Sequence, residues 1–102
     1  MERTIKRQEL MQKLGKFQKV ENMTSYNTYR AVPNQYELKF ENGYVFQSYD
    51  SLIAVMLHGE LYLTDLHDYS VTTNKYANQF TGRNCKERRE GLKSGEFIRI
   101  VD

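Results

Sequence analysis

Residues 36–57 read YELKFENGYVFQSYDSLIAVML, and the apolar patterns within them predict the middle of a β-sheet. In residues 36–40 apolar and charged side chains alternate, which is typical of a strand with one buried face. Residues 52–57 are continuously apolar, and so short a run suits a strand buried on both faces better than a helix. With strands also expected at 44–49 and 60–64, the pattern predicts an antiparallel meander.

The turn between the first two strands contains Asn42-Gly43, the strongest short signal for a β-hairpin. A two-residue loop at these positions would place Gln47 on the apolar face of the hairpin. A three-residue loop ending at Gly43 instead pairs Leu38 with Phe46 and gathers the aromatic and aliphatic residues on one face. Since burial sets the register, we predict the three-residue loop, with Gly43 in the left-handed region.

Outside the meander, Leu10, Leu14 and Phe17 recur at helical spacing and predict a helix over residues 3–17 that covers the sheet. The other expected elements are a polar connector at 21–28, the beginning of the sheet at about 29–32, a turn at Pro33-Asn34, a turn at His58-Gly59, helices at about 72–81 and 85–93, and a last strand at about 96–101. The expected fold is a single α+β domain over residues 1–102, with an antiparallel sheet at about 29–64, an N-terminal helix and two short C-terminal helices.

Length and composition exclude several classes of protein. The chain has 102 residues, of which 39% are hydrophobic and 27% charged, as expected for one ordered domain. A single cysteine rules out a disulfide framework within the chain. No apolar run approaches the roughly 20 residues of a membrane span, so we expect no membrane association and a cytosolic location.

Charge is distributed unevenly along the chain. Residues 1–19 carry a net charge of +4, residues 20–69 carry −5 and residues 70–102 carry +3. One interpretation is that these charges lie on solvated surfaces, and that the basic ends of the chain attract its acidic middle weakly. The other is that the two basic ends form one positive face for a phosphate backbone or an acidic protein.

Residues that could carry chemistry are few and lack the usual spacing. His58 and His67 do not form a metal-ligand pattern, and no serine lies in a nucleophile-elbow sequence. Cys85 begins a basic helical stretch that could lower the pKa of its thiol, but the favoured interpretation is an ordinary small residue near a helix start. We therefore expect no catalytic residues, no metal, no cofactor and no enzymatic activity.

The polar segment 68–76 stands where the chain leaves the sheet and enters a helix. Ser70, Thr72 or Thr73 can cap that helix by accepting hydrogen bonds from its free N–H groups. A second interpretation is a partner-binding surface. The residues that this surface would use are Tyr69, Lys75 and Tyr76.

Three strings of this sequence resemble a short family of proteins of unknown function that are encoded largely by bacteriophages and plasmids. The strings are Phe46–Ala54, Tyr62–Thr64 and Asp68–Tyr76 followed by Phe80. The resemblance covers about residues 36–98 and leaves the N-terminal helix outside. Its specific element is the motif Tyr-Ser-x-Thr-Thr-x-Lys-Tyr-x-x-x-Phe.

This resemblance implies a small accessory protein of a mobile element, acting in the cytoplasm of a bacterial host. By analogy with other short proteins of such elements, the expected function is non-enzymatic inhibition of a host defence system through protein binding. The expected partner is a CRISPR effector nuclease with its guide RNA, as for anti-CRISPR proteins, and the expected state is a monomer or homodimer.

The alternative function is a small nucleic-acid-binding regulator. Aromatic residues on a sheet can stack bases, but those of residues 36–46 are more typical of a core, and the sheet segment is acidic. Phosphate contacts would therefore come from the basic C-terminal helix, helped by the N-terminal segment. The residues concerned are Lys86, Arg88, Arg89 and Lys93, with Lys6, Arg7 and Lys13.

Overall fold

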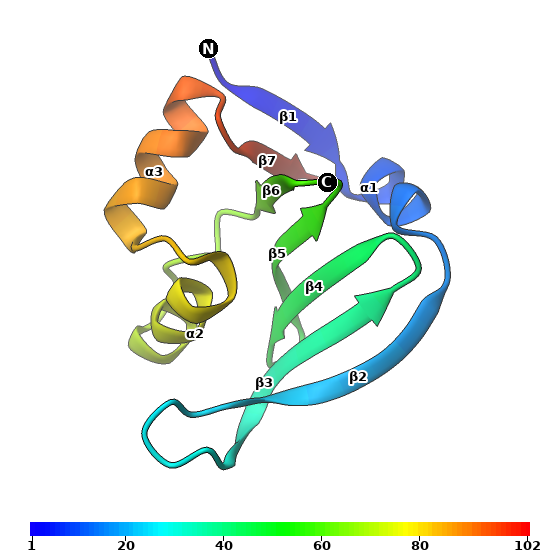
Figure 1. Ribbon diagram of the computed structural model, residues 1–102. Coiled ribbons are helices and arrows are strands. Elements are labelled where there is room, and N and C mark those ends of the chain that lie inside the picture. The colour runs from blue at the N-terminus through cyan, green and yellow to red at the C-terminus, as the bar shows by residue number, and fades with distance from the viewer.

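One seven-stranded sheet and three helices make up the computed structural model, which describes residues 1–102 (Figure 1). In chain order the elements are β1 Arg3–Lys6, α1 Arg7–Leu14, β2 Phe17–Thr24, β3 Ala31–Phe40, β4 Gly43–Ser48, β5 Ser51–Leu57, β6 Glu60–Leu63, α2 Val71–Thr81, α3 Cys85–Ser94 and β7 Ile98–Val101. The strands lie in the order β1-β7-β6-β5-β4-β3-β2. Strands β2 to β6 form an antiparallel meander, whereas β7 runs parallel to both β6 and β1. The α+β class is confirmed, and the sheet is mostly antiparallel.

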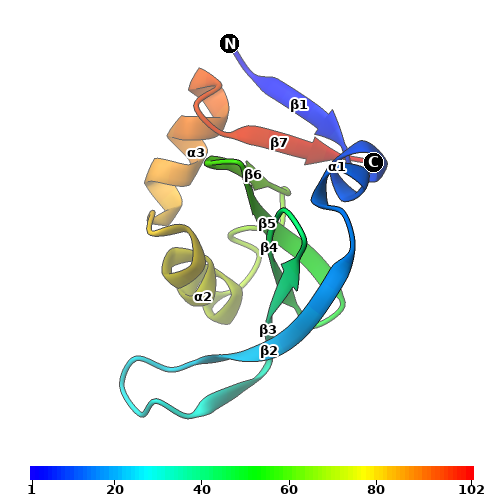
Figure 2. The same ribbon diagram turned by 45° about the vertical axis from the view of Figure 1, so that its right-hand side comes forward.

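A separate hydrophobic core lies on each face of the sheet. Helix α1 places Leu14 in a cluster with Val55 on one face, whereas α3 places Leu92 in a cluster with Phe46 on the other. Figure 2 shows α2 and α3 on the opposite side of the strands from α1. The central strands therefore carry apolar side chains on both faces, as the continuous apolar run in β5 predicted.

Strand β5 also contains a β-bulge. Phe46 pairs with Ala54 and Gln47 pairs with Leu52, so Ile53 has no residue opposite it on β4. The extra residue lets Ile53 and Ala54 both join the core under α2 and α3. Leu52 packs on the α1 side.

The register predicted for the β3–β4 hairpin is wrong. The loop consists of residues 41–42, Leu38 pairs with Val45, and Gly43 is the first residue of β4 with no positive φ. The prediction assumed one buried face, but α2 and α3 cover the second face and bury Phe46 completely. Leu38 and Phe46 therefore point to opposite faces, and alternation alone could not set the register.

The predicted helix over residues 3–17 is too long. Residues 3–6 form strand β1, in which Ile5 lies opposite Ile100 of β7. Helix α1 then ends at Gly15, which has φ +78°. Leu10 and Leu14 are buried as expected, but Phe17 begins β2 and is 53% exposed. Pairing with β7, far away in the sequence, overrides the local helical pattern of the first residues.

The expected connector at 21–28 is also only partly present, because β2 continues to Thr24. Pro33-Asn34 lies within β3, where Asn34 adopts φ +65° without ending the strand. The turn at His58-Gly59, both C-terminal helices and the last strand are confirmed. None of the helices has the length and apolar character needed to cross a membrane.

Candidate binding surface

Ser70 is the N-cap of α2, as one of the sequence alternatives predicted. Its Oγ accepts a hydrogen bond from the Thr73 N–H at 3.1 Å, which satisfies one of the free donors at the helix start. The Thr73 hydroxyl is buried and lies 3.0 Å from the Ser48 hydroxyl on β4. This chain of hydroxyls fixes the start of α2 against the sheet, so Ser70 and Thr73 have a structural role.

The rest of the motif divides between the core and the surface. Tyr76 is 5% exposed and belongs to the core under α2, and the Phe80 ring lies 5.9 Å from the Phe46 ring. Little of Tyr76 is therefore accessible to a partner. Lys75 and Tyr69 are exposed, so these two of the three predicted partner-binding residues remain available.

Arg88 is completely buried, although the sequence placed it among the phosphate-binding residues. Its Nε donates to His67 Nδ1 at 3.0 Å and its Nη2 donates to the His67 carbonyl at 3.2 Å. Further bonds go to the side-chain oxygens of Asn74 and Asn78, both at 2.5 Å, and to the Arg83 carbonyl at 2.7 Å. Every acceptor is neutral. The guanidinium thus ties α3 to α2 and to the loop before α2, and is withdrawn from solvent.

His67 is buried beside this guanidinium, and burial lowers the pKa of its imidazole below the ordinary value. The nearby Arg88 charge acts in the same direction, although Asp68 opposes it. Since Nδ1 accepts the hydrogen bond from Arg88, the imidazole is neutral in the folded protein. His67 is a structural acceptor, and no cluster of three His, Cys, Asp or Glu side chains suited to a metal ion occurs in the chain.

Three cations of α3 remain on the surface: Lys86, Arg89 and Lys93. The Arg89 guanidinium bonds Asp68 Oδ2 through Nε at 3.1 Å and Nη2 at 2.7 Å. These bonds lower the pKa of the Asp68 carboxyl. The Cys85 thiol also donates to Asp68 Oδ2, at 3.5 Å. Arg89 is therefore partly neutralised, and only the two lysines are free of such a contact.

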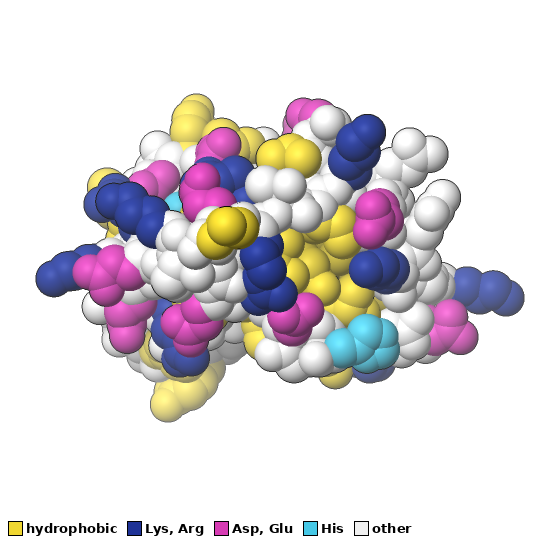
Figure 3. Space-filling model, turned by 90° about the horizontal axis from the view of Figure 1, so that it is seen from above, with side chains coloured by type: hydrophobic (Ala, Val, Ile, Leu, Met, Phe, Trp, Pro, Cys, Tyr) yellow, Lys and Arg dark blue, Asp and Glu magenta, His cyan; other side chains and the backbone are white.

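The basic residues of the two chain ends do not form one surface. Helices α1 and α3 lie over opposite faces of the sheet, which separates Lys6, Arg7 and Lys13 from the α3 cations. On the end of the molecule seen in Figure 3, basic and acidic side chains are interspersed. Four ion pairs join the basic ends to the acidic middle: Arg3–Glu60, Lys19–Glu21, Arg89–Asp68 and Arg99–Asp65. Part of the charge of the ends is thus compensated within the fold.

A groove of about 680 Å³ lies between the β4–β5 turn and the start of α2. Tyr49 and Asp50 line it from the turn, and Tyr69 and Leu66 line it from the loop before α2. Both tyrosines are well exposed, at 56% and 74%. Five residues with hydroxyl groups also line the groove: Ser48, Ser51, Ser70, Thr72 and Thr73. The groove can therefore offer aromatic surface, hydrogen-bonding groups and one carboxylate to a partner.

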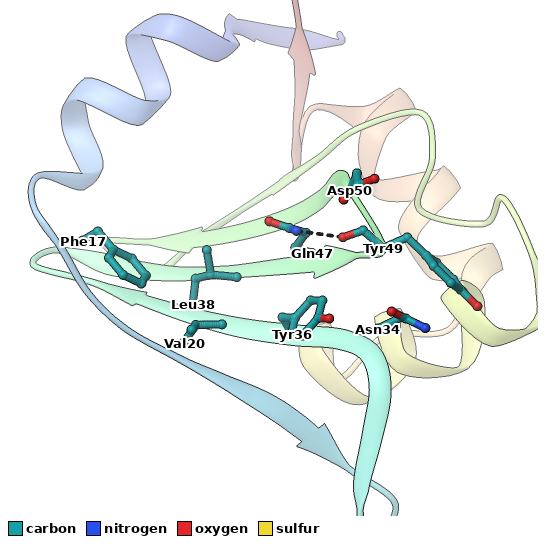
Figure 4. Close-up of a pocket in the computed structure, with 8 residues that line it drawn as sticks. All are labelled: Phe17, Val20, Asn34, Tyr36, Leu38, Gln47, Tyr49 and Asp50. Atoms are coloured by element: carbon teal, nitrogen blue, oxygen red, sulfur yellow. Dashed lines mark hydrogen bonds between the residues drawn. The ribbon is translucent and has the colours of Figure 1, made fainter.

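A second hollow, of about 440 Å³, lies on the α1 side of β2, β3 and β4 (Figure 4). Val20, Tyr36 and Leu38 form its apolar floor, and the Gln47 amide donates to the Tyr49 carbonyl at its rim. Tyr49 and Asp50 border this hollow as well as the groove. The β4–β5 turn thus lies between two depressions on adjacent surfaces.

Sequence reasoning missed Tyr49 and Asp50 as surface residues of this site. The signal was an aromatic residue in a tight turn, where small or polar residues are usual. Tyr49 adopts φ +54°, a conformation that bulky residues rarely take and that clusters at functional positions. Tyr29, Asn34 and His58 also have positive φ, so the exposed side chain of Tyr49 and its place beside the groove, rather than its backbone conformation, make it a candidate.

The fold and the groove define a small α+β protein with two exposed tyrosines beside a surface groove. The chain belongs to a family of unknown function (DUF8033), whose family model matches residues 4–98. The match includes the N-terminal segment that the resemblance had left outside. No curated protein and no solved structure matches the chain.

Proposed function

We propose that this protein is a non-enzymatic accessory protein of a mobile element that binds and inhibits a host defence complex. The groove between the β4–β5 turn and α2 is its binding surface. The observation that carries the proposal is the pair of exposed side chains Tyr49 and Tyr69 beside Asp50. Tyrosine is favoured at binding hot spots because its rigid ring buries a large area while its hydroxyl stays polar.

The chemistry of the groove favours a partner with basic side chains. Asp50 is the only charged residue that lines it, and residues 20–69 carry a net charge of −5. An arginine or lysine of the partner would find a carboxylate and two aromatic rings there. A CRISPR effector nuclease, which holds guide RNA and DNA in positively charged channels, offers surfaces of this kind. We therefore take an anti-CRISPR activity as the first to test.

A plasmid-interference assay in cells carrying a CRISPR effector tests this proposal. Wild-type protein is expected to restore plasmid establishment, whereas Tyr49→Ala and Tyr69→Ala are expected to lose that effect without losing stability. Tyr44→Ala is the matched control, because Tyr44 is also exposed but lies at the other end of β4. Lys75→Ala tests whether the surface extends along α2; its stability should stay within about 0.5 kcal/mol of wild type. Unchanged interference across several effector types, with well-expressed protein, would contradict the proposal.

The alternative, a nucleic-acid-binding regulator, depends on the exposed α3 cations Lys86, Arg89 and Lys93. Their spacing in the helix places them on one side of α3, which favours phosphate contacts. A gel-shift titration at low salt separates the two functions. Binding that weakens steeply with salt and is lost in Lys86→Glu/Lys93→Glu would support the alternative. Absence of binding would remove it and leave the inhibitor proposal untouched.

A further inference from the structure

Strand β2 forms one edge of the sheet and is eight residues long. It pairs only with β3, so the backbone groups on its outer side have no strand beside them (Figures 1 and 4). Such an edge is a template for pairing with another strand. The opposite edge, β1, has only four residues. The long edge is therefore the better candidate for extension of the sheet.

The charges on β2 and β3 are arranged unfavourably within one chain. Lys19 lies opposite Lys39 and Glu21 lies opposite Glu37, so like charges face each other across the two strands. Like charges in directly opposite positions destabilise a sheet. The contact between Lys19 Nζ and Glu21 Oε1, at 2.9 Å along the same strand, only partly compensates. A neighbouring strand on the free side of β2 could place an acidic residue opposite Lys19 and a basic residue opposite Glu21, which would offset the like-charge repulsion.

We propose that a second copy of this chain pairs with β2 through its own β2, antiparallel, about a two-fold axis at Val20. This register places Lys19 of each copy opposite Glu21 of the other, because the two residues are equally distant from Val20 in the sequence. The strand is thus self-complementary, as a two-fold interface requires. Lysine on an edge strand usually discourages pairing, but here each lysine meets a carboxylate.

The apolar residues of β2 fit the same arrangement. Val20 is 53% exposed and lies beside Leu38 on the floor of the hollow of Figure 4. At the two-fold axis the Val20 side chains of both copies would contact each other. The two hollows would then lie side by side on one continuous sheet face. Burial of this apolar surface adds to the hydrogen bonds of the new strand pair.

Charge reversal tests the register directly. Glu21→Lys gives a strand with two positive charges and Lys19→Glu gives one with two negative charges, so each variant should pair with itself more weakly than wild type does. Mixed in equal amounts, the two variants should pair, because each lysine then meets a glutamate. The double variant Lys19→Glu/Glu21→Lys should pair like wild type. Both positions are well exposed, and each single change replaces a like-charge pair with β3 by an opposite-charge pair. The monomer fold should therefore be kept.

Sedimentation equilibrium measures the outcome at concentrations from about 1 µM to 1 mM. Wild type should reach twice the monomer mass of 12.1 kDa at the higher concentrations. Each single variant should dimerise at least about tenfold more weakly, and the equimolar mixture should recover the wild-type affinity. Circular dichroism confirms that every variant is folded. Wild type that stays monomeric throughout, or a dimer unaffected by Glu21→Lys, would overturn the proposal. Neither result would bear on the groove at Tyr49 and Tyr69.

Discussion

Replacing Arg88 by methionine should destabilise the protein more than any surface change. Methionine keeps much of the length of the side chain but removes all of its donors. Five acceptors lose their partner: two on His67, and one each on Asn74, Asn78 and Arg83. The perturbation therefore isolates the hydrogen bonds that link α3 to α2 and to the loop before α2.

The size of the effect follows from which acceptors can reach water. Asn74 and Asn78 are half-buried and Arg83 is exposed, so their oxygens can be solvated. Nδ1 and the backbone carbonyl of His67 are buried, so water cannot replace the lost hydrogen bonds there. The two unpaired acceptors of His67 together cost about 2–6 kcal/mol, and removal of the buried cation relieves a desolvation penalty that offsets part of this cost. We expect a net loss of about 2–4 kcal/mol, out of the roughly 5–15 kcal/mol typical of a domain.

Urea denaturation followed by circular dichroism measures this loss as a lower transition midpoint at an unchanged slope. Lys86→Met on the same helix is the matched control. Because Lys86 is exposed, its replacement should change the free energy of unfolding by no more than about 0.5 kcal/mol. An Arg88→Met protein as stable as wild type would refute the assignment of Arg88 as the link between the helices.

Three further predictions concern stability. The folded pKa of His67 is lowered, so the unfolded chain binds a proton more readily. The free energy of unfolding should therefore fall as pH decreases below about 6.5, and this fall should be smaller in His67→Gln. Urea titrations between pH 7 and 5 check the sign, and stability that rises on acidification in this range would contradict it. Ser70→Ala removes the N-cap of α2 and should cost about 0.5–2 kcal/mol, measured by thermal unfolding, with an unchanged melting temperature as the contrary result. Gln35 is completely buried, and neither polar atom of its amide has a hydrogen-bond partner. Gln35→Met should therefore raise the free energy of unfolding by about 1–2 kcal/mol in urea denaturation. A destabilised variant would show that the amide is hydrogen-bonded in solution.

Strands β3 to β6 and the two C-terminal helices could be predicted because their signals are local. Residues 52–57 are apolar throughout, and Ser70, Gly82, Asn84 and Gly95 mark the ends of the helices. The hairpin register could not be predicted in the same way. It depends on α2 and α3 burying Phe46 from the far side, and these helices lie more than 20 residues further along the chain.

The candidate site could be predicted only in part. Tyr69 was identified from the motif, but Tyr49 became part of the same groove only through the packing of the β4–β5 turn against the loop before α2. Arg88 and its neighbour Arg89 were both predicted to contact phosphates, because the sequence does not show which side of α3 faces α2. The structure buries one and exposes the other.

The position of β7 between β1 and β6 makes the pairing of β1 the least local contact of the sheet. Strand β1 pairs only with β7, and Arg3 lies opposite Ile98. The meander instead joins segments that follow one another along the chain. Contacts between distant segments slow folding, because a long loop must close before they form. We therefore expect the pairing of β1 with β7 to form after the meander.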